Sequence, residues 1–131
     1  MKTVAAVGII FLLFLCSCSE KNGIERIVNM TVDFVWDLKH PQRSPEIHLK
    51  NTPKGTEHFH IEFIDATNEW EHGGGSITND DTGIIRAGAL KEFKGLSSTW
   101  GTPKIRLSVA AFNKDGRLIG KGEIVKRPPD D

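Results

Sequence analysis

Apolar and polar residues alternate with a period of two along much of the chain, which is typical of strands that bury one face. The clearest case reads HFHIEFID at 58–65, where Phe59, Ile61 and Phe63 share one face. No segment has an apolar stripe of period 3.6 that predicts an amphipathic helix. The segments with the alternating pattern are Thr31–Trp36, Glu46–Lys50, His58–Asp65, Lys104–Phe112, Arg117–Val125 and, more weakly, Gly83–Leu90.

Turn residues separate these segments. Asn113–Gly116 (NKDG) predicts a tight hairpin because Gly accepts the positive φ that the turn requires. Asn51–Gly55 predicts another turn, while His72–Asp81 and Leu96–Pro103 read as loops, the first with at most a short strand. Six or seven strands in this order predict one antiparallel β-sandwich. Its expected core consists of Phe59, Ile61, Phe63, Ile105, Leu107 and Val109, with Trp36 beside them.

The N-terminus has the pattern of a secretory signal. One cation, Lys2, precedes an uninterrupted apolar run from Val4 to Leu15. This run is shorter than the ~20 helical residues that cross a bilayer, and it matches the apolar part of a signal peptide.

The residues after this run read LCSC at 15–18 and resemble the bacterial lipobox. In that motif a Leu lies three positions before the acylated Cys, and a small residue lies directly before it. Leu15 and Ser17 meet both conditions for Cys18, whereas the residue before Cys16 is bulky. Cys18 is therefore the expected lipidation site. The alternatives are an ordinary secretory signal with two incidental cysteines and a retained membrane anchor.

This assignment divides the chain into a lipoprotein signal peptide (1–17), a lipidated tether (18–26) and the β-sandwich domain (27–131). Acyl chains make the attachment to the membrane effectively permanent, because each buried CH₂ contributes ~0.8 kcal/mol. Ser19 follows the lipidated Cys, and a residue other than Asp there resembles the outer-membrane default of enteric-type bacteria. We expect a lipid-anchored protein of the bacterial cell envelope, at the outer membrane rather than the inner one.

Composition and motifs exclude several classes of function. The 17 Lys and Arg residues balance the 17 Asp and Glu residues, which argues against a nucleic-acid partner. The sequence contains no GxSxG, HExxH, P-loop or GxGxxG motif, so we expect neither an enzyme nor a cofactor. Cys18 is the last cysteine, so the domain has no disulfide. The glycines at 73–75 suit a loop that passes close to another backbone or contacts a ligand.

Three histidines raise the possibility of a metal site. His48, His58 and His60 occupy outward positions of two segments that follow one another. If these segments pair as a hairpin, matched apolar faces put His48 opposite His58 or His60, with Cβ atoms ~5 Å apart. Such imidazoles could bind Zn²⁺ or Cu²⁺. The alternatives are a solvated face and two strands that belong to different sheets.

A second group of polar residues follows the strand at 58–65. Asp65 ends that strand, and Trp70 and His72 lie in the segment after it. An acceptor, a donor and an apolar wall at one end of a sandwich could line a pocket for a small anion. The alternative is an Asp65 that caps the turn and an exposed His72.

The stretch SPEIHLKNTPKGT at 44–56, followed by FHIEFID at 59–65, resembles the phosphatidylethanolamine-binding protein family, including its bacterial Raf-kinase-inhibitor-like members. That family shows a Ser-Pro, an alternating strand, a Pro-x-Gly-Thr turn and an apolar strand that ends in Asp, with a His shortly after. LSVAAF at 107–112 looks like the family's late core strand. The resemblance implies a β-sandwich that binds phospholipid headgroups or other anions, or inhibits protein partners, without being an enzyme.

Carried over residue by residue, the resemblance places Asp65 and His72 at the family's anion pocket, with Lys104 near the position of a family Arg. The chain departs from the family directly after Asp65, where 65–70 reads DATNEW and lacks the family's second Asp and both prolines. The departure implies an altered pocket, for which Trp70 or Trp100 would supply an apolar wall.

The leading prediction is thus a membrane-anchored lipoprotein with a non-catalytic binding sandwich for a small anion, a headgroup or a protein partner. Two alternatives stay open. One is an immunoglobulin-like or fibronectin-like interaction module without a small-molecule pocket. The other is a periplasmic metal binder that uses the histidines.

Overall fold

The computed structural model describes residues 26–96 and 104–129, and this part of the chain is all-β, with eight strands and no helix. The strands are β1 (Val28–Asn29), β2 (Thr31–Phe34), β3 (Ile47–Lys50), β4 (His58–Asp65), β5 (Glu71–Thr78), β6 (Ile84–Ile85), β7 (Ile105–Phe112) and β8 (Leu118–Lys126). The all-β fold class predicted from alternation is confirmed.

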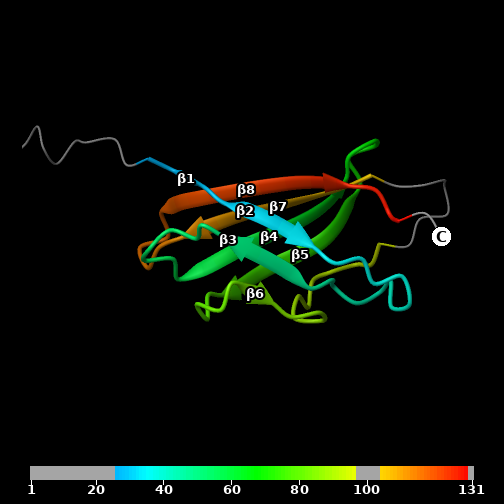
Figure 1. Cartoon of the computed structure of the whole chain (residues 1–131), viewed down its shortest axis with the longest axis horizontal. Coiled ribbons are helices and arrows are strands. Elements are labelled where there is room, and N and C mark those ends of the chain that lie inside the picture. The colour runs from blue at the N-terminus through cyan, green and yellow to red at the C-terminus, as the bar shows by residue number, and fades with distance from the viewer. Residues whose placement is uncertain (1–25, 97–103, 130–131) are drawn as a thin grey trace, which may run out of the picture.

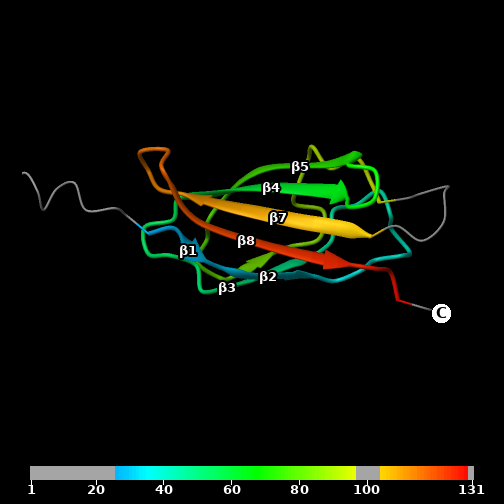
Figure 2. The same cartoon turned by 90° about the horizontal axis from the view of Figure 1, so that it is seen from above.

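The strands form two layers (Figures 1 and 2). One sheet has five strands in the order β1-β8-β7-β4-β5, and the other has three in the order β2-β3-β6. All described pairs are antiparallel except β1 with β8, which is parallel. The strand count is slightly above the expected six or seven, and one pair is parallel in an otherwise antiparallel arrangement. The additional short strand β1 spans two residues and passes through Met30 directly into β2, so consecutive strands lie in different sheets.

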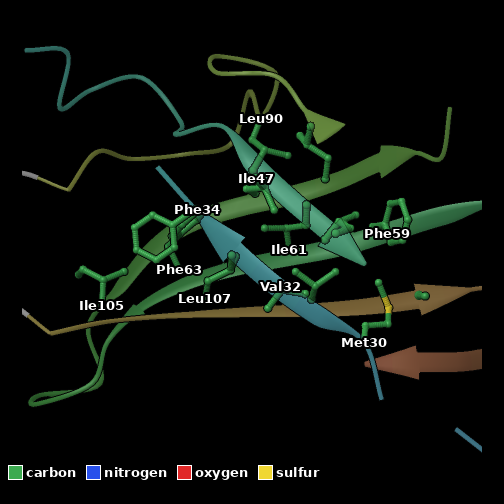
Figure 3. Packing of buried hydrophobic residues seen from close by; sticks show 14 residues of the cluster. Met30, Val32, Phe34, Ile47, Phe59, Ile61, Phe63, Leu90, Ile105 and Leu107 are labelled. Carbon is green, nitrogen blue, oxygen red and sulfur yellow. The ribbon is translucent and has the colours of Figure 1, made fainter. Parts of the chain in front are cut away.

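The core lies between the two sheets (Figure 3). Phe63 is fully buried, with its ring 5.5 Å from that of Phe34 and 5.2 Å from that of Phe93, both edge to face. Trp36 packs on Phe34 with ring centroids 5.2 Å apart, as expected for its place beside the core. Period-two alternation in β4 and β7 therefore identified the buried face, because the predicted core residues Phe59, Ile61, Phe63, Ile105, Leu107 and Val109 are all buried.

The tight hairpin predicted at Asn113–Gly116 joins β7 to β8. The N–H of Asn113 donates to the carbonyl of Arg117 at 3.0 Å, and the N–H of Gly116 donates to the carbonyl of Asn113 at 3.0 Å. Gly116 has a φ of 77°, the conformation for which glycine is preferred.

The loop expected at His72–Asp81 is wrong, because most of it forms β5, a strand of eight residues. Its three glycines hide the strand from sequence reading, since they leave no side chains to alternate. Close packing requires two of them, Gly73 and Gly74. A Cβ on Gly73 would lie 2.2 Å from the carbonyl oxygen of Glu92, and one on Gly74 would lie 2.0 Å from that of Ile61. The expected close approach of another backbone is therefore confirmed. Conversely, only Ile84–Ile85 of the weak candidate Gly83–Leu90 is strand.

Candidate binding site

The expected hairpin between the segments at 46–50 and 58–65 is wrong. β3 pairs with β2 and β6 in the small sheet, whereas β4 pairs with β5 and β7 in the large one. His48 is therefore in a different sheet from His58 and His60. His48 and His58 also have different side-chain partners. His48 Nε2 lies 2.6 Å from Glu46 Oε1, and the ring of His58 stacks on Phe112. The described residues contain no group of three or more His, Cys, Asp or Glu that could hold a metal ion.

The second predicted group lies at one end of the large sheet, where the backbone brings three of its members together. The N–H of Asp65 donates to the carbonyl of Trp70 at 2.8 Å, and the N–H of Ala66 donates to the carbonyl of Lys104 at 2.7 Å. His72 is two residues further along, in β5.

The side chains of Asp65 and His72 in this group make hydrogen bonds to nearby backbone. Asp65 is buried, and its Oδ1 accepts the N–H of Thr67 at 2.8 Å and that of Asn68 at 3.4 Å. His72 is half-buried rather than exposed, with Nδ1 2.8 Å from the carbonyl oxygen of Gly95. Trp70 is 61% exposed. The turn-capping alternative thus describes the Asp65 carboxylate, and the hollows described below are lined by other residues.

The largest of these hollows, which we name the outer hollow, lies on the face of the five-stranded sheet that points away from the core. Its volume is about 540 Å³, and its walls rise from β4 on one side and β8 on the other. β7 runs between them and contributes Ser108, Val109 and Ala110, of which Ser108 and Ala110 have short side chains that face outward. A second hollow of about 470 Å³ extends toward β5 and shares His60 and Glu62 with the first.

Strand register arranges the polar side chains of the outer hollow in two rows. Glu62, Ser108 and Glu123 are direct neighbours across β4, β7 and β8. One row further along the sheet, His60 and Lys121 flank Ala110. Neighbouring strands are about 4.8 Å apart, so the two carboxylates of the first row start from backbones about 10 Å apart. One row is therefore acidic, and the adjacent row carries nitrogen bases.

Two hydrogen bonds join polar side chains of the two rows. His60 Nε2 lies 3.1 Å from Glu62 Oε1, and the hydroxyl of Ser108 donates to Glu123 Oε2 at 3.4 Å. His60 and Glu62 have side chains 46% and 53% exposed, so both reach solvent. The arrangement can bind a small ligand that carries a cation and an anion a few ångströms apart, because each row offers the opposite charge.

Sequence reasoning missed Ser108, Lys121 and Glu123. Alternation in β7 and β8 already turned them outward, and the hairpin at 113–116 fixed the register that joins Ser108 to Glu123. The sequence did not indicate which strand pairs with the other edge of β7. Only pairing between β4 and β7, which lie far apart in sequence, brings Glu62 into the same row.

Several sequence-based expectations fall on residues outside the described part of the chain, namely the signal peptide, the lipidation site Cys18 and the tether up to residue 25, together with Trp100. Among the described residues, no helix is long and apolar enough to cross a membrane. Comparison of the whole chain with models of protein families gave no match, and a search of the curated proteins gave none either.

Proposed function

We propose that this chain is a lipoprotein of the bacterial cell envelope, anchored through Cys18, whose β-sandwich binds a small ligand in the outer hollow without turning it over. The observation that carries the binding proposal is the pairing of an acidic row with a row of nitrogen bases above a floor of short side chains. A phosphoethanolamine headgroup has the matching pair of charges, with its ammonium for Glu62 and Glu123 and its phosphate for Lys121.

The resemblance to phosphatidylethanolamine-binding proteins supports the same ligand class and belongs to this proposal. The family's anion pocket corresponds to the end of the sheet that holds Asp65 and His72. In this chain the Asp65 carboxylate accepts two backbone N–H groups of its own turn. Geometry therefore favours the outer hollow over the end of the sheet as the place where a headgroup binds.

Calorimetry with O-phosphoethanolamine, inorganic phosphate and ethanolamine tests the two rows separately. We expect Lys121→Gln to weaken binding of phosphoethanolamine and phosphate about fivefold, since one exposed charge-assisted contact is lost, and to leave ethanolamine unaffected. Glu123→Gln should weaken binding of phosphoethanolamine and ethanolamine and leave binding of phosphate unaffected. Lys114→Gln, on the hairpin outside the outer hollow, is the matched control and should change nothing. Equal affinities for Lys121→Gln and Lys114→Gln contradict the proposal, and weakening by His72→Ala alone moves the site to the end of the sheet.

The anchor has its own test. Cys18→Ser removes the expected acylation site, so the protein should leave the membrane fraction and its precursor should accumulate unprocessed. Cys16→Ser is the matched control and should be processed and sedimented like the wild type. Cell fractionation and metabolic labelling with a palmitate analogue measure both effects. Unchanged membrane association of Cys18→Ser rules the anchor out.

A further inference from the structure

β5 is the last strand of the five-stranded sheet, and no other described strand pairs with its outer edge. In an antiparallel pair, the backbone groups of every second residue point away from the neighbouring strand. Gly74 belongs to this set in β5, because its N–H donates to the carbonyl of Glu92 at 3.4 Å rather than to β4. Ser76 and Thr78, two and four residues further on, therefore present their N–H and C=O groups at the same edge.

The chain covers only the first half of this edge. In addition to the hydrogen bond from Gly74 to Glu92, the N–H of Lys94 donates to the carbonyl of His72 at 2.7 Å. The segment around residue 93 therefore runs alongside β5 like a short added strand. Beyond it, no strand of the described residues pairs with β5 at Ser76 or Thr78. Residues 73–78 carry no charge and no proline, the usual devices that keep an edge from pairing.

An apolar slot lies beside the open half of the edge. It has a volume of about 160 Å³ and lies between β5 and β6, which are the last strands of their respective sheets on this side of the sandwich. Its apolar wall includes Leu49, Phe59, Ile77, Ile84, Ile85 and Ala89. Side chains of a strand added to β5 would alternate between the two faces, so one of them would point into this slot. The slot has room for one aliphatic side chain.

Charge at the end of β5 defines the occupant further. Asp80 and Asp81 follow the strand, and both are exposed. Hydrogen bonds from the hydroxyl and N–H of Thr82 hold the pKa of Asp80 below its usual value, so that carboxylate stays ionised. Arg86 lies on the β6 side of the slot. A strand that runs along β5 thus meets negative charge two residues after Thr78.

We propose that the open edge of β5 binds an extended segment of another protein by strand addition, with an aliphatic side chain in the slot and a Lys or Arg beside Asp80 and Asp81. This surface is separate from the outer hollow. A second copy of the chain fits it less well. Its own β5, which reads EHGGGSIT, contains no Lys or Arg that could lie beside Asp80 and Asp81.

Two labelled nonapeptides of alternating Thr and Val, one ending in Lys at both ends and one in Glu, test the proposal on the full-length chain in detergent. Fluorescence anisotropy should show saturable binding of the Lys peptide, about fivefold tighter than that of the Glu peptide. Amide hydrogen exchange gives the location. The N–H groups of Ser76 and Thr78 should exchange about tenfold more slowly when the peptide is bound.

Ser76→Pro removes one edge-facing N–H and leaves the ladder to β4 intact, because that group points away from β4. We expect Ser76→Pro to weaken binding of the Lys peptide about tenfold. The control Ser76→Ala keeps the N–H and should bind the peptide like the wild type. Ala89→Leu, which fills the slot, should weaken binding of the Lys peptide about as much as Ser76→Pro does. Thermal melting establishes that each variant is folded, and Lys121→Gln should leave peptide binding unchanged.

Three results would overturn the proposal. The first is no saturable binding of the Lys peptide to the wild type. The second is equal affinity of Ser76→Pro and Ser76→Ala. The third is a concentration-dependent dimer of the wild type that Ser76→Pro abolishes, which would assign the edge to a second copy instead.

Discussion

Phe63→Ala is expected to lower the free energy of unfolding by about 3–5 kcal/mol, because the change leaves a cavity that the surrounding side chains fill only in part. Phe63 is fully buried, and its ring meets the edges or faces of Phe34 and Phe93, one from the opposite sheet and one from the segment that follows β6. A loss of this size is a large part of the ~5–15 kcal/mol that stabilises a typical domain. Urea unfolding followed by tryptophan fluorescence measures it.

Phe112→Ala is the matched control for this prediction. Phe112 lies in the same sheet but on the outer face, where it is half-buried and stacks on His58 with ring centroids 5.2 Å apart. Losing that contact should cost about 0.5–1.5 kcal/mol. If the two variants were equally stable, the assignment of the buried and outer faces of the sheet would be wrong.

Gly73→Ala is the second change with a large expected effect. Gly73 has a φ of 80°, and an added Cβ would lie 2.2 Å from the carbonyl oxygen of Glu92. The left-handed conformation alone costs about 1–3 kcal/mol for a residue that disfavours it. The clash adds to this cost, because the obstacle is backbone and the segment at 92–94 has to move. We expect the segment to detach from β5 and the melting temperature to fall.

Gly116→Ala separates the two contributions. Its φ of 77° is nearly that of Gly73, but nothing lies within 4 Å of an added Cβ. Gly116→Ala therefore has the conformational cost without the clash. It should lower the melting temperature clearly less than Gly73→Ala does. Hydrogen exchange at Lys94, whose N–H bonds to His72, reports the detachment directly and should rise only in Gly73→Ala.

The large sheet was predictable to the extent that its strands alternate. β4 and β7 agree with their predicted spans to within one residue, because Phe59 to Phe63 and Ile105 to Ala111 carry an apolar side chain at every second position. β5 was not predictable in the same way. Its residues 73–75 have no side chains, and Gly73 and Gly74 are required by the backbones of Glu92 and Ile61, which are distant in sequence.

Pairing between strands was the other limit. Alternation tells which side of a strand faces the core, but it does not tell which sheet the strand joins. The turn at Pro53–Gly55 looked like a hairpin, yet it carries the chain from β3 in one sheet to β4 in the other. The metal hypothesis depended on that hairpin. The outer hollow was missed for the same reason, since Glu62 and Glu123 become neighbours of Ser108 only through β4 and β8 on either side of β7.

The parallel pairing of β1 with β8 also has a mechanical consequence. The chain enters β1 at one end of the sheet and leaves β8 at the other (Figure 2), so a force between these two ends acts along the strands. Hydrogen bonds between β1 and β8 are then loaded in shear and must break together rather than being unzipped one by one. Through Met30 the same tension passes into β2, whose Asp33 is held by Lys126 of β8 at 2.9 Å. A force that pulls these two ends apart would therefore load both sheets at once.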